Sequence, residues 1–111
     1  MLDGGQDLPR GTLELMILKV LSLEPMHGWG IIQRVRQLSQ DIFQVNQGSL
    51  YPALQRLKKK GWIRSEWRVT ENSRRARYYT LTDSGREKLG EERRAWEMST
   101  AAVSRILEAT S

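Results

Sequence analysis

The sequence predicts a mainly helical fold that contains one small β-hairpin and ends in a long helix. Three observations predict it: apolar residues recur at helical spacing in three segments before residue 61, two strand-like stretches flank a polar turn at residues 70–75, and a seven-residue apolar repeat follows Thr82. The chain has 111 residues, and domains usually contain about 50–250 residues. We therefore expect a single compact unit.

The composition excludes several classes of protein. Hydrophobic residues make up 39% of the chain and charged residues 28%, which is typical of a folded chain and not of a disordered one. No apolar run approaches the roughly 18 residues that span a membrane, and the polar residues 1–8 do not resemble a signal peptide. The chain has no cysteine, which excludes disulfides and fits a reducing compartment. These features predict a cytoplasmic protein without membrane contact.

The first helix is expected after a flexible tail at residues 1–9. Its apolar positions follow the i, i+3, i+4, i+7 spacing of an amphipathic helix: Leu13, Met16, Ile17, Val20 and Leu21. Leu15 and Leu18 add a second apolar side, so part of this helix could pack against a partner chain. Pro25 ends the helix.

The second helix is expected to run from about Gly28 to Leu38, with its inward positions at Ile31, Ile32, Val35 and Leu38.

The third helix is predicted to begin between Asn46 and Ser49, because both are plausible caps. Pro52 is best tolerated in its first turn. The apolar stripe consists of Leu50, Leu54 and Leu57, and Gly61 ends the helix.

A two-stranded hairpin should follow, with strands at about 62–69 and 76–81. Thr82 then caps a helix that extends to about Ala109. Three helices, a hairpin and one long helix describe a winged helix-turn-helix domain at residues 10–82 followed by a dimerisation helix at residues 83–111.

The positive charge is concentrated in the middle of the sequence. Residues 41–82 carry nine basic and three acidic side chains, whereas residues 1–40 carry four of each and residues 83–111 carry five and six. A polyanion is the expected partner of such a segment, and double-stranded DNA fits best. Solvated surface charge is the alternative interpretation.

The third helix has the division of faces that a helix in a major groove requires. Opposite its leucines lie Pro52, Gln55, Arg56 and Lys59, with Ser49 and Lys60 on the flank. We expect base contacts from the start of the helix, at Gln47, Gly48, Ser49 and Tyr51, and phosphate contacts from Arg56, Lys59 and Lys60. On the hairpin, Arg74, Arg75 and Arg77 should touch the DNA backbone or enter a minor groove.

The final helix suggests a homodimer. Leu89, Trp96 and Val103 repeat at seven residues and are joined by Ile106 and Leu107, although Glu92 and Ser99 interrupt the seam. Packing of this helix on its own domain is the alternative. Trp96 could line a pocket between subunits together with Ser99 and Thr100, but a structural role is the favoured interpretation.

No catalytic site is predicted. His27 is the only histidine, no cysteine is present, and no phosphate-cradling glycine loop or activated nucleophile is recognisable. The sequence therefore predicts neither an enzyme nor a bound metal or cofactor, and His27 is interpreted as a cap or packing residue.

The stretches GTLELMILKVLSLEPMHGWGI, VNQGSLYPALQRLKKKGWI and SRRARYYTLTDSGREKL resemble the PadR-like family of bacterial transcriptional regulators. The resemblance covers about residues 10–107 and is strongest to the small subgroup with a single C-terminal helix, of acidobacterial type. Trp29 departs from the pattern, since tyrosine is more usual there, and this difference should affect packing only.

The resemblance implies a homodimeric repressor on a palindromic operator. It places Gly48–Pro52 at the start of the recognition helix, Arg74 and Arg75 on the wing, and Tyr79 and Leu81 in the anchoring strand. It also implies a small aromatic effector that enters the dimer interface at Trp96. The alternative function is a winged-helix module for protein–protein assembly, in which the basic patch meets an acidic partner.

Overall fold

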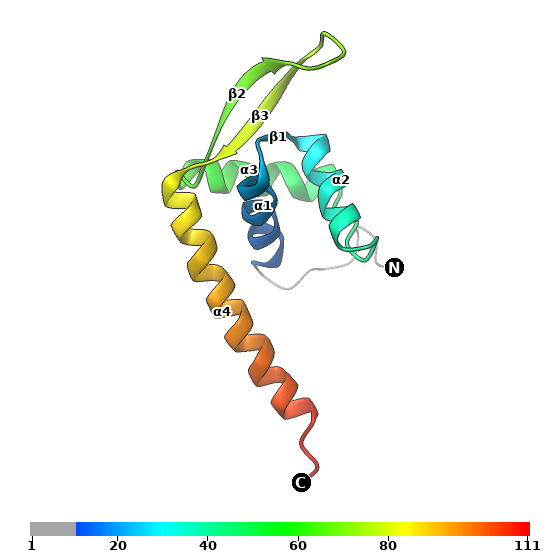
Figure 1. Ribbon diagram of the computed structural model, residues 1–111, viewed down its shortest axis with the longest axis vertical. Helices are drawn as coiled ribbons and strands as arrows, with labels where there is room; N and C mark the ends of the chain where they lie inside the picture. Colours follow the sequence, from blue (N-terminus) through cyan, green and yellow to red (C-terminus); the bar gives the residue numbers. More distant parts are fainter. Residues whose placement is uncertain (1–10) are drawn as a thin grey trace.

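A computed structural model describes residues 11–111, and the predicted tail at residues 1–9 lies outside these described residues. Apart from the short strand β1, the elements follow the predicted order (Figure 1): α1 (Thr12–Leu23), β1 (Met26–His27), α2 (Gly28–Leu38), α3 (Gln47–Lys59), β2 (Ile63–Val69), β3 (Arg75–Leu81) and α4 (Asp83–Leu107). The fold is a winged helix-turn-helix with a long C-terminal helix, as the sequence predicts. None of the helices described is long and apolar enough to cross a membrane.

The hairpin belongs to a three-stranded antiparallel sheet with the order β1-β3-β2. The sequence analysis did not predict β1, in which Met26 pairs with Tyr79 and His27 with Tyr78. A strand of two residues has no alternating pattern to reveal it. This pairing connects the start of α2 to the part of β3 near the base of the hairpin, and so fixes the position of the hairpin relative to the helices.

The core lies between α1, α2, α3 and the base of the sheet. Its largest fully buried side chains are Ile17, Leu18, Ile31, Leu50, Leu54, Leu57 and Ile63. Leu18 is only 1% exposed in the single chain. The expectation that Leu18 faces a partner is therefore corrected: Leu18 is covered within the chain, where α2, α3 and α4 all pack against α1, whereas Leu15 is half-buried.

Leu38 also departs from its predicted place, since it is 57% exposed. It is the last residue of α2, so the buried stripe of that helix ends one turn earlier, at Val35.

Side-chain caps fix where α2, α3 and α4 begin. The Nδ1 atom of His27 accepts from the Gly30 N–H at 3.0 Å, which confirms the interpretation of His27 as a cap. Asn46, not Ser49, caps α3, and its side chain accepts from the Ser49 N–H at 2.8 Å. Thr82 caps α4 by accepting from the Gly85 N–H at 3.0 Å.

Pro52 lies beyond the first turn of α3, contrary to expectation, because the helix already begins at Gln47. A proline has no N–H to donate to the carbonyl four residues earlier. The Gly48 carbonyl therefore lacks its usual helical partner.

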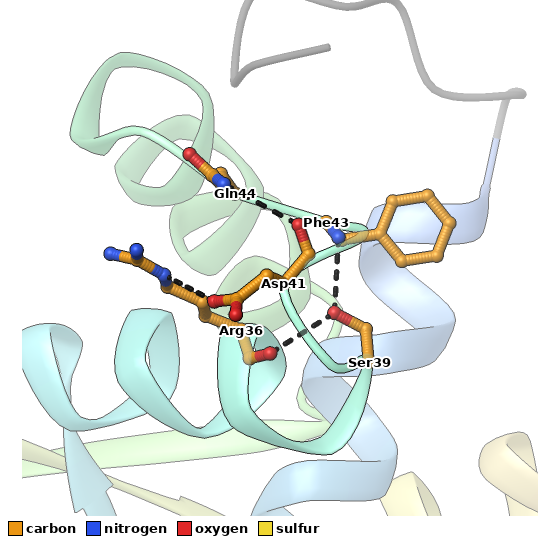
Figure 2. A network of polar contacts seen from close by, with 5 residues as sticks. All are labelled: Arg36, Ser39, Asp41, Phe43 and Gln44. Atoms are coloured by element: carbon orange, nitrogen blue, oxygen red, sulfur yellow. Dashed lines mark hydrogen bonds and ion pairs between the residues drawn. The ribbon is translucent and has the colours of Figure 1, made fainter.

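The connection between α2 and α3 is held by a local network of hydrogen bonds (Figure 2). Arg36 Nε donates to Asp41 Oδ1 at 2.8 Å, and the Phe43 N–H donates to Ser39 Oγ at 3.0 Å. Gln40 and Asp41 both adopt positive φ angles, of 54° and 68°. The turn is thus well defined, and it sets the orientation of α3 relative to α2.

A second junction joins the end of α3 to the start of α4. The Gly61 carbonyl accepts from Thr82 Oγ1 at 2.7 Å and from Ser84 Oγ at 3.0 Å. A Cβ atom on Gly85 would collide with the Trp62 carbonyl, so only glycine allows this approach.

Beyond this junction α4 leaves the body and extends away from the wing (Figure 1). The described residues measure 61 × 32 × 21 Å along their principal axes. Leu89 packs partly against the core, whereas Trp96, Val103, Ile106 and Leu107 are exposed. Gly85 is the sole buried residue of this helix.

Candidate nucleic-acid interface

The start of α3 presents a polar surface. Leu50, Ala53, Leu54 and Leu57 point into the core. Gln47, Gly48, Ser49, Pro52, Gln55 and Lys59 are all exposed. The helix contains no acidic residue. Its outer face therefore offers amide and hydroxyl groups near the N-terminus and positive charge near the C-terminus, which is the arrangement that base and phosphate contacts require.

Tyr51 lies on the flank of α3 that faces α2. A Cβ atom on Gly28 would lie 2.8 Å from the Tyr51 Cζ atom, so the phenol ring packs directly on the first turn of α2. The side chain remains 40% exposed. Its position at the crossing of two helices restricts its movement and leaves one side of the ring accessible.

Arg56 lies on the other flank, beside α1. Its Nε atom is 2.8 Å from Glu14 Oε2, in an ion pair between side chains that are 57% and 31% exposed. Arg56 was expected to hold a phosphate, but the structure gives it a carboxylate partner. All three cations predicted to hold phosphates are exposed, but Arg56 pairs with Glu14, whereas Lys59 projects from the outer face of the helix.

Lys60 lies at the C-terminal end of α3, with its Nζ atom 5.2 Å from the centre of the Trp62 ring. Lys88 from α4 approaches the same ring at 4.8 Å. These contacts place Lys60 at the junction of α3 with α4, away from the start of the recognition helix.

The wing turn carries Arg74. The Thr70 N–H donates to the Arg74 carbonyl at 2.6 Å, and the Ser73 N–H donates to the Thr70 carbonyl at 3.0 Å. Arg75, which was predicted to lie in the turn, is the first residue of β3 and pairs with Val69. The three arginines therefore divide between the tip (Arg74) and the strand (Arg75 and Arg77).

Trp67 is a residue that the sequence analysis missed. The guanidinium groups of Arg75 and Arg77 lie 5.1 and 5.3 Å from the centre of its ring. Trp67 and Arg77 face each other across the hairpin, in the same antiparallel register. Counting outward from the ends of the predicted turn would have paired Trp67 with Tyr78, because that turn includes Arg75, which is the first residue of β3.

The opposite face of the hairpin is closed by local contacts. Arg68 Nε is 2.6 Å from Glu66 Oε2, and the guanidinium also lies 5.1 Å from the Tyr78 ring centre. Arg68 thus has a carboxylate partner within its own strand, unlike the two arginines around Trp67.

Tyr79 anchors β3 in the core and is 4% exposed. Burial raises the pKa of its hydroxyl above the usual 10.0, the nearby Tyr51 raises it further, and Arg77 opposes both. The phenol therefore stays neutral at physiological pH and adds no negative charge beneath the wing. The pKa of Tyr79 is higher in the folded state than in the unfolded state. The buried neutral hydroxyl therefore contributes fully to the free energy of unfolding below pH 10.0, and this contribution is lost as the pH rises through the folded-state pKa.

His27 contacts the ring of Tyr78 edge-on, with centroids 5.3 Å apart. Its Nδ1 atom is already used as the cap of α2. Within residues 11–111, no three histidine, cysteine or acidic side chains are grouped so that they could hold a metal ion.

Comparison with known proteins agrees with this arrangement. The model of the transcriptional regulator PadR-like family matches residues 17–91. The transcriptional regulator Rv3488 of Mycobacterium tuberculosis is 37% identical over 92 residues, which is 83% of this chain and 82% of that protein.

Solved structures show the same fold. A transcriptional regulator from Clostridium thermocellum superposes with a TM-score of 0.81 at 25% identity, covering 89% of this chain and 96% of that one. A PadR family transcriptional regulator from Eggerthella lenta gives a TM-score of 0.79 at 30% identity, over 91% and 86% of the two chains. The chain therefore belongs to the PadR-like family of transcriptional regulators, which bind DNA and are not enzymes.

Proposed function

We propose that this chain is a sequence-specific repressor that binds a palindromic operator as a homodimer. The observation that carries the proposal is the surface of α3, where an exposed polar start and an exposed Lys59 stand opposite four buried residues, with no acidic side chain in the helix. A wing with three arginines projects from the same domain (Figure 1). Together they form the positively charged part of an otherwise nearly neutral chain.

The structure supports different roles for the basic and polar residues. In the proposal Gln47, Gly48 and Ser49 contact base edges, with Tyr51 and Pro52 at the edge of that surface. The side chains of Lys59, Arg74, Arg75 and Arg77 hold phosphates. Arg56 and Lys60 have smaller roles, because each already contacts another side chain of the domain.

The proposed dimer forms through α4. Its outer half exposes apolar side chains on one face that a single chain leaves in water: Trp96, Val103, Ile106 and Leu107 are between 50% and 78% exposed. Contiguous apolar surface of this kind marks an association site. Leu15 and Leu89, which are half-buried, would extend the contact toward the body. A two-fold dimer would present its recognition helices to two half-sites about one helical turn of DNA apart.

A small aromatic effector is proposed to bind between the two α4 helices and to relieve repression. Support comes from Trp96, whose ring is half exposed on the face expected to meet the partner. Ser99 and Thr100 lie one turn further on. The Thr100 hydroxyl donates to the Trp96 carbonyl at 2.8 Å, which leaves its oxygen as an acceptor toward a ligand. Because the proposed role is on DNA, we expect the protein in the cytoplasm. Its membership of the small acidobacterial-type subgroup stays a prediction.

The proposal is tested by fluorescence anisotropy with the DNA upstream of the protein's own gene and with a scrambled duplex, at several salt concentrations. We expect tighter binding to the native duplex by about a hundredfold or more, with a steep salt dependence. Weak and equal binding that disappears at physiological salt would contradict the proposal and favour the protein–protein assembly module.

A further inference from the structure

One face of the hairpin, here called its inner face, is buried at the base of the wing and exposed near the tip. Side chains on one face of β2 alternate with those on the other, so Ile63, Ser65, Trp67 and Val69 share a face, with Leu81, Tyr79, Arg77 and Arg75 as their cross-strand partners. At the base this face is core, since Ile63 is 2% and Leu81 6% exposed. Near the tip it is open, because Trp67 is 54% and Val69 70% exposed.

Two arginine guanidinium groups lie over the ring of the exposed Trp67. Arg77 lies directly across from Trp67 and Arg75 lies diagonally, which is the spacing at which long side chains on one face of a hairpin meet. Their guanidinium carbons are 5.3 and 5.1 Å from the ring centre, within the range of a cation–π interaction. A guanidinium held over an aromatic ring still has N–H groups that can donate to phosphate oxygens.

No acidic side chain competes for these guanidinium groups on this face. The residues that line it, from Ile63 to Val69 and from Arg75 to Leu81 at alternate positions, include no aspartate or glutamate. The acidic residue of β2, Glu66, is on the other face and pairs with Arg68. Arg75 and Arg77 are therefore ordered by an aromatic ring while their hydrogen-bonding edges are not taken by a carboxylate of the described residues.

We propose that Trp67 is a positioning residue, which holds Arg75 and Arg77 side by side so that they bind two phosphates of duplex DNA. This inference rests on the proposed DNA-binding function. A long side chain that binds from a disordered state loses rotamer freedom, and pre-ordering removes much of that cost. In the proposal the ring acts through the two arginines, whose guanidinium groups lie over it, and it does not insert between bases.

The arrangement makes the effect of Trp67 conditional on the arginines. We would measure the affinity of the full chain for a mixed-sequence duplex, by anisotropy at several salt concentrations, because phosphate contacts need no operator. The variants are Trp67→Ala, Trp67→Phe, the double variant Arg75→Gln with Arg77→Gln, and the triple variant that adds Trp67→Ala. Thermal unfolding of each variant verifies that it is folded at the temperature of the assay.

Trp67→Ala is expected to weaken binding about tenfold, as two side chains must then be ordered on binding. Trp67→Phe, which keeps an aromatic face, should recover most of that loss. In the background without the two arginines, Trp67→Ala should change the affinity by less than about twofold. Trp29→Ala is the matched control, because Trp29 is also 54% exposed but lies on α2, and it should leave the affinity within about twofold.

Three results would overturn the inference. If the wild type binds DNA and Trp67→Ala binds it with equal affinity, Trp67 has no role in DNA binding, and the inference fails while the proposed function stands. The same loss with and without the two arginines means that the indole contacts DNA itself. If the wild type binds no duplex at all, the proposed function fails together with the inference.

Discussion

Helices α3 and α4 share an amphipathic pattern but differ in what covers their apolar side. In α3 four of 13 residues are buried, against α1, α2 and the base of β2. In α4 one of 25 residues is buried, and it is a glycine at the junction. The comparison teaches that α3 exposes a polar face because its own chain fills the other face, whereas the open apolar face of α4 is a surface on which we expect a second molecule.

The outer half of α4 has little to stabilise it within one chain. The ion pair between Arg93 and Glu97, at 3.2 Å, connects residues of the same helix. A pair of this kind stabilises a helix by only about 0.2–0.5 kcal/mol. Four variants test the contrast between α3 and α4, and the contributions of the wing and of the ion pair between Glu14 and Arg56.

The largest effect is expected from Trp96→Glu on α4. An ionised carboxylate in an apolar interface costs several kcal/mol, and a two-fold dimer incurs this cost twice. The variant should be a monomer, with the winged-helix body still folded, when measured by size-exclusion chromatography with light scattering. Trp96→Phe is the control and should remain dimeric. An unaltered dimer of Trp96→Glu would remove this part of α4 from the interface.

The second substitution addresses the filled side of α3. Leu54 is 0% exposed, and Leu54→Ala should lower the free energy of unfolding by about 2–5 kcal/mol in urea denaturation. Gln55, its exposed neighbour, provides the control, and Gln55→Ala should stay within about 0.5 kcal/mol of the wild type. A similar cost for both variants would show that α3 is not packed as described.

The third substitution sharpens the difference between the wing and the recognition helix. Arg74→Ala combined with Arg75→Ala should weaken binding to every duplex alike and reduce the slope of log affinity against log salt by about 1.8, which corresponds to two phosphates. The native and scrambled duplexes serve as each other's control in anisotropy titrations. An unchanged affinity and slope would exclude the wing from the DNA contact.

The smallest effect is expected from Glu14→Gln, which breaks the ion pair with Arg56. An exposed pair is worth about 0.2–1 kcal/mol, so the stability should fall by less than about 1 kcal/mol. Arg56 would then be available to a phosphate, and the salt slope should rise by up to about 0.9. A slope equal to that of the wild type would place Arg56 away from the DNA.

Much of the fold could be predicted from the sequence because its signals are local. The recurrence of apolar residues along α1 and α3 and the caps at His27 and Thr82 depend on neighbours within a few positions. The hairpin was also recognisable, because its two strands flank a turn of polar residues.

The features that were missed depend on distant parts of the chain. Met26–His27 is a strand only because β3 lies beside it, and Leu18 is buried because α1 is packed against α2, α3, α4 and β3. Arg56 meets a carboxylate 42 residues earlier. The site could therefore be predicted as a set of exposed polar and basic positions, but the distribution of its charges among protein partners could not.

The junction that holds α4 to the body has a mechanical consequence. The Gly61 carbonyl and the close approach of Gly85 to Trp62 clamp the first turn of α4, and a helix of 25 residues is about 37 Å long. A rod clamped at one end works as a lever: a tilt of about 5° at the base moves its far end by about 3 Å. In the proposed dimer the two rods meet far from the DNA, so a small change in their crossing angle alters the span between the recognition helices. A Cβ atom added at Gly85 would loosen this junction. In the proposed dimer we expect the preference for one spacing between half-sites to be lost before the affinity for DNA phosphates is lost.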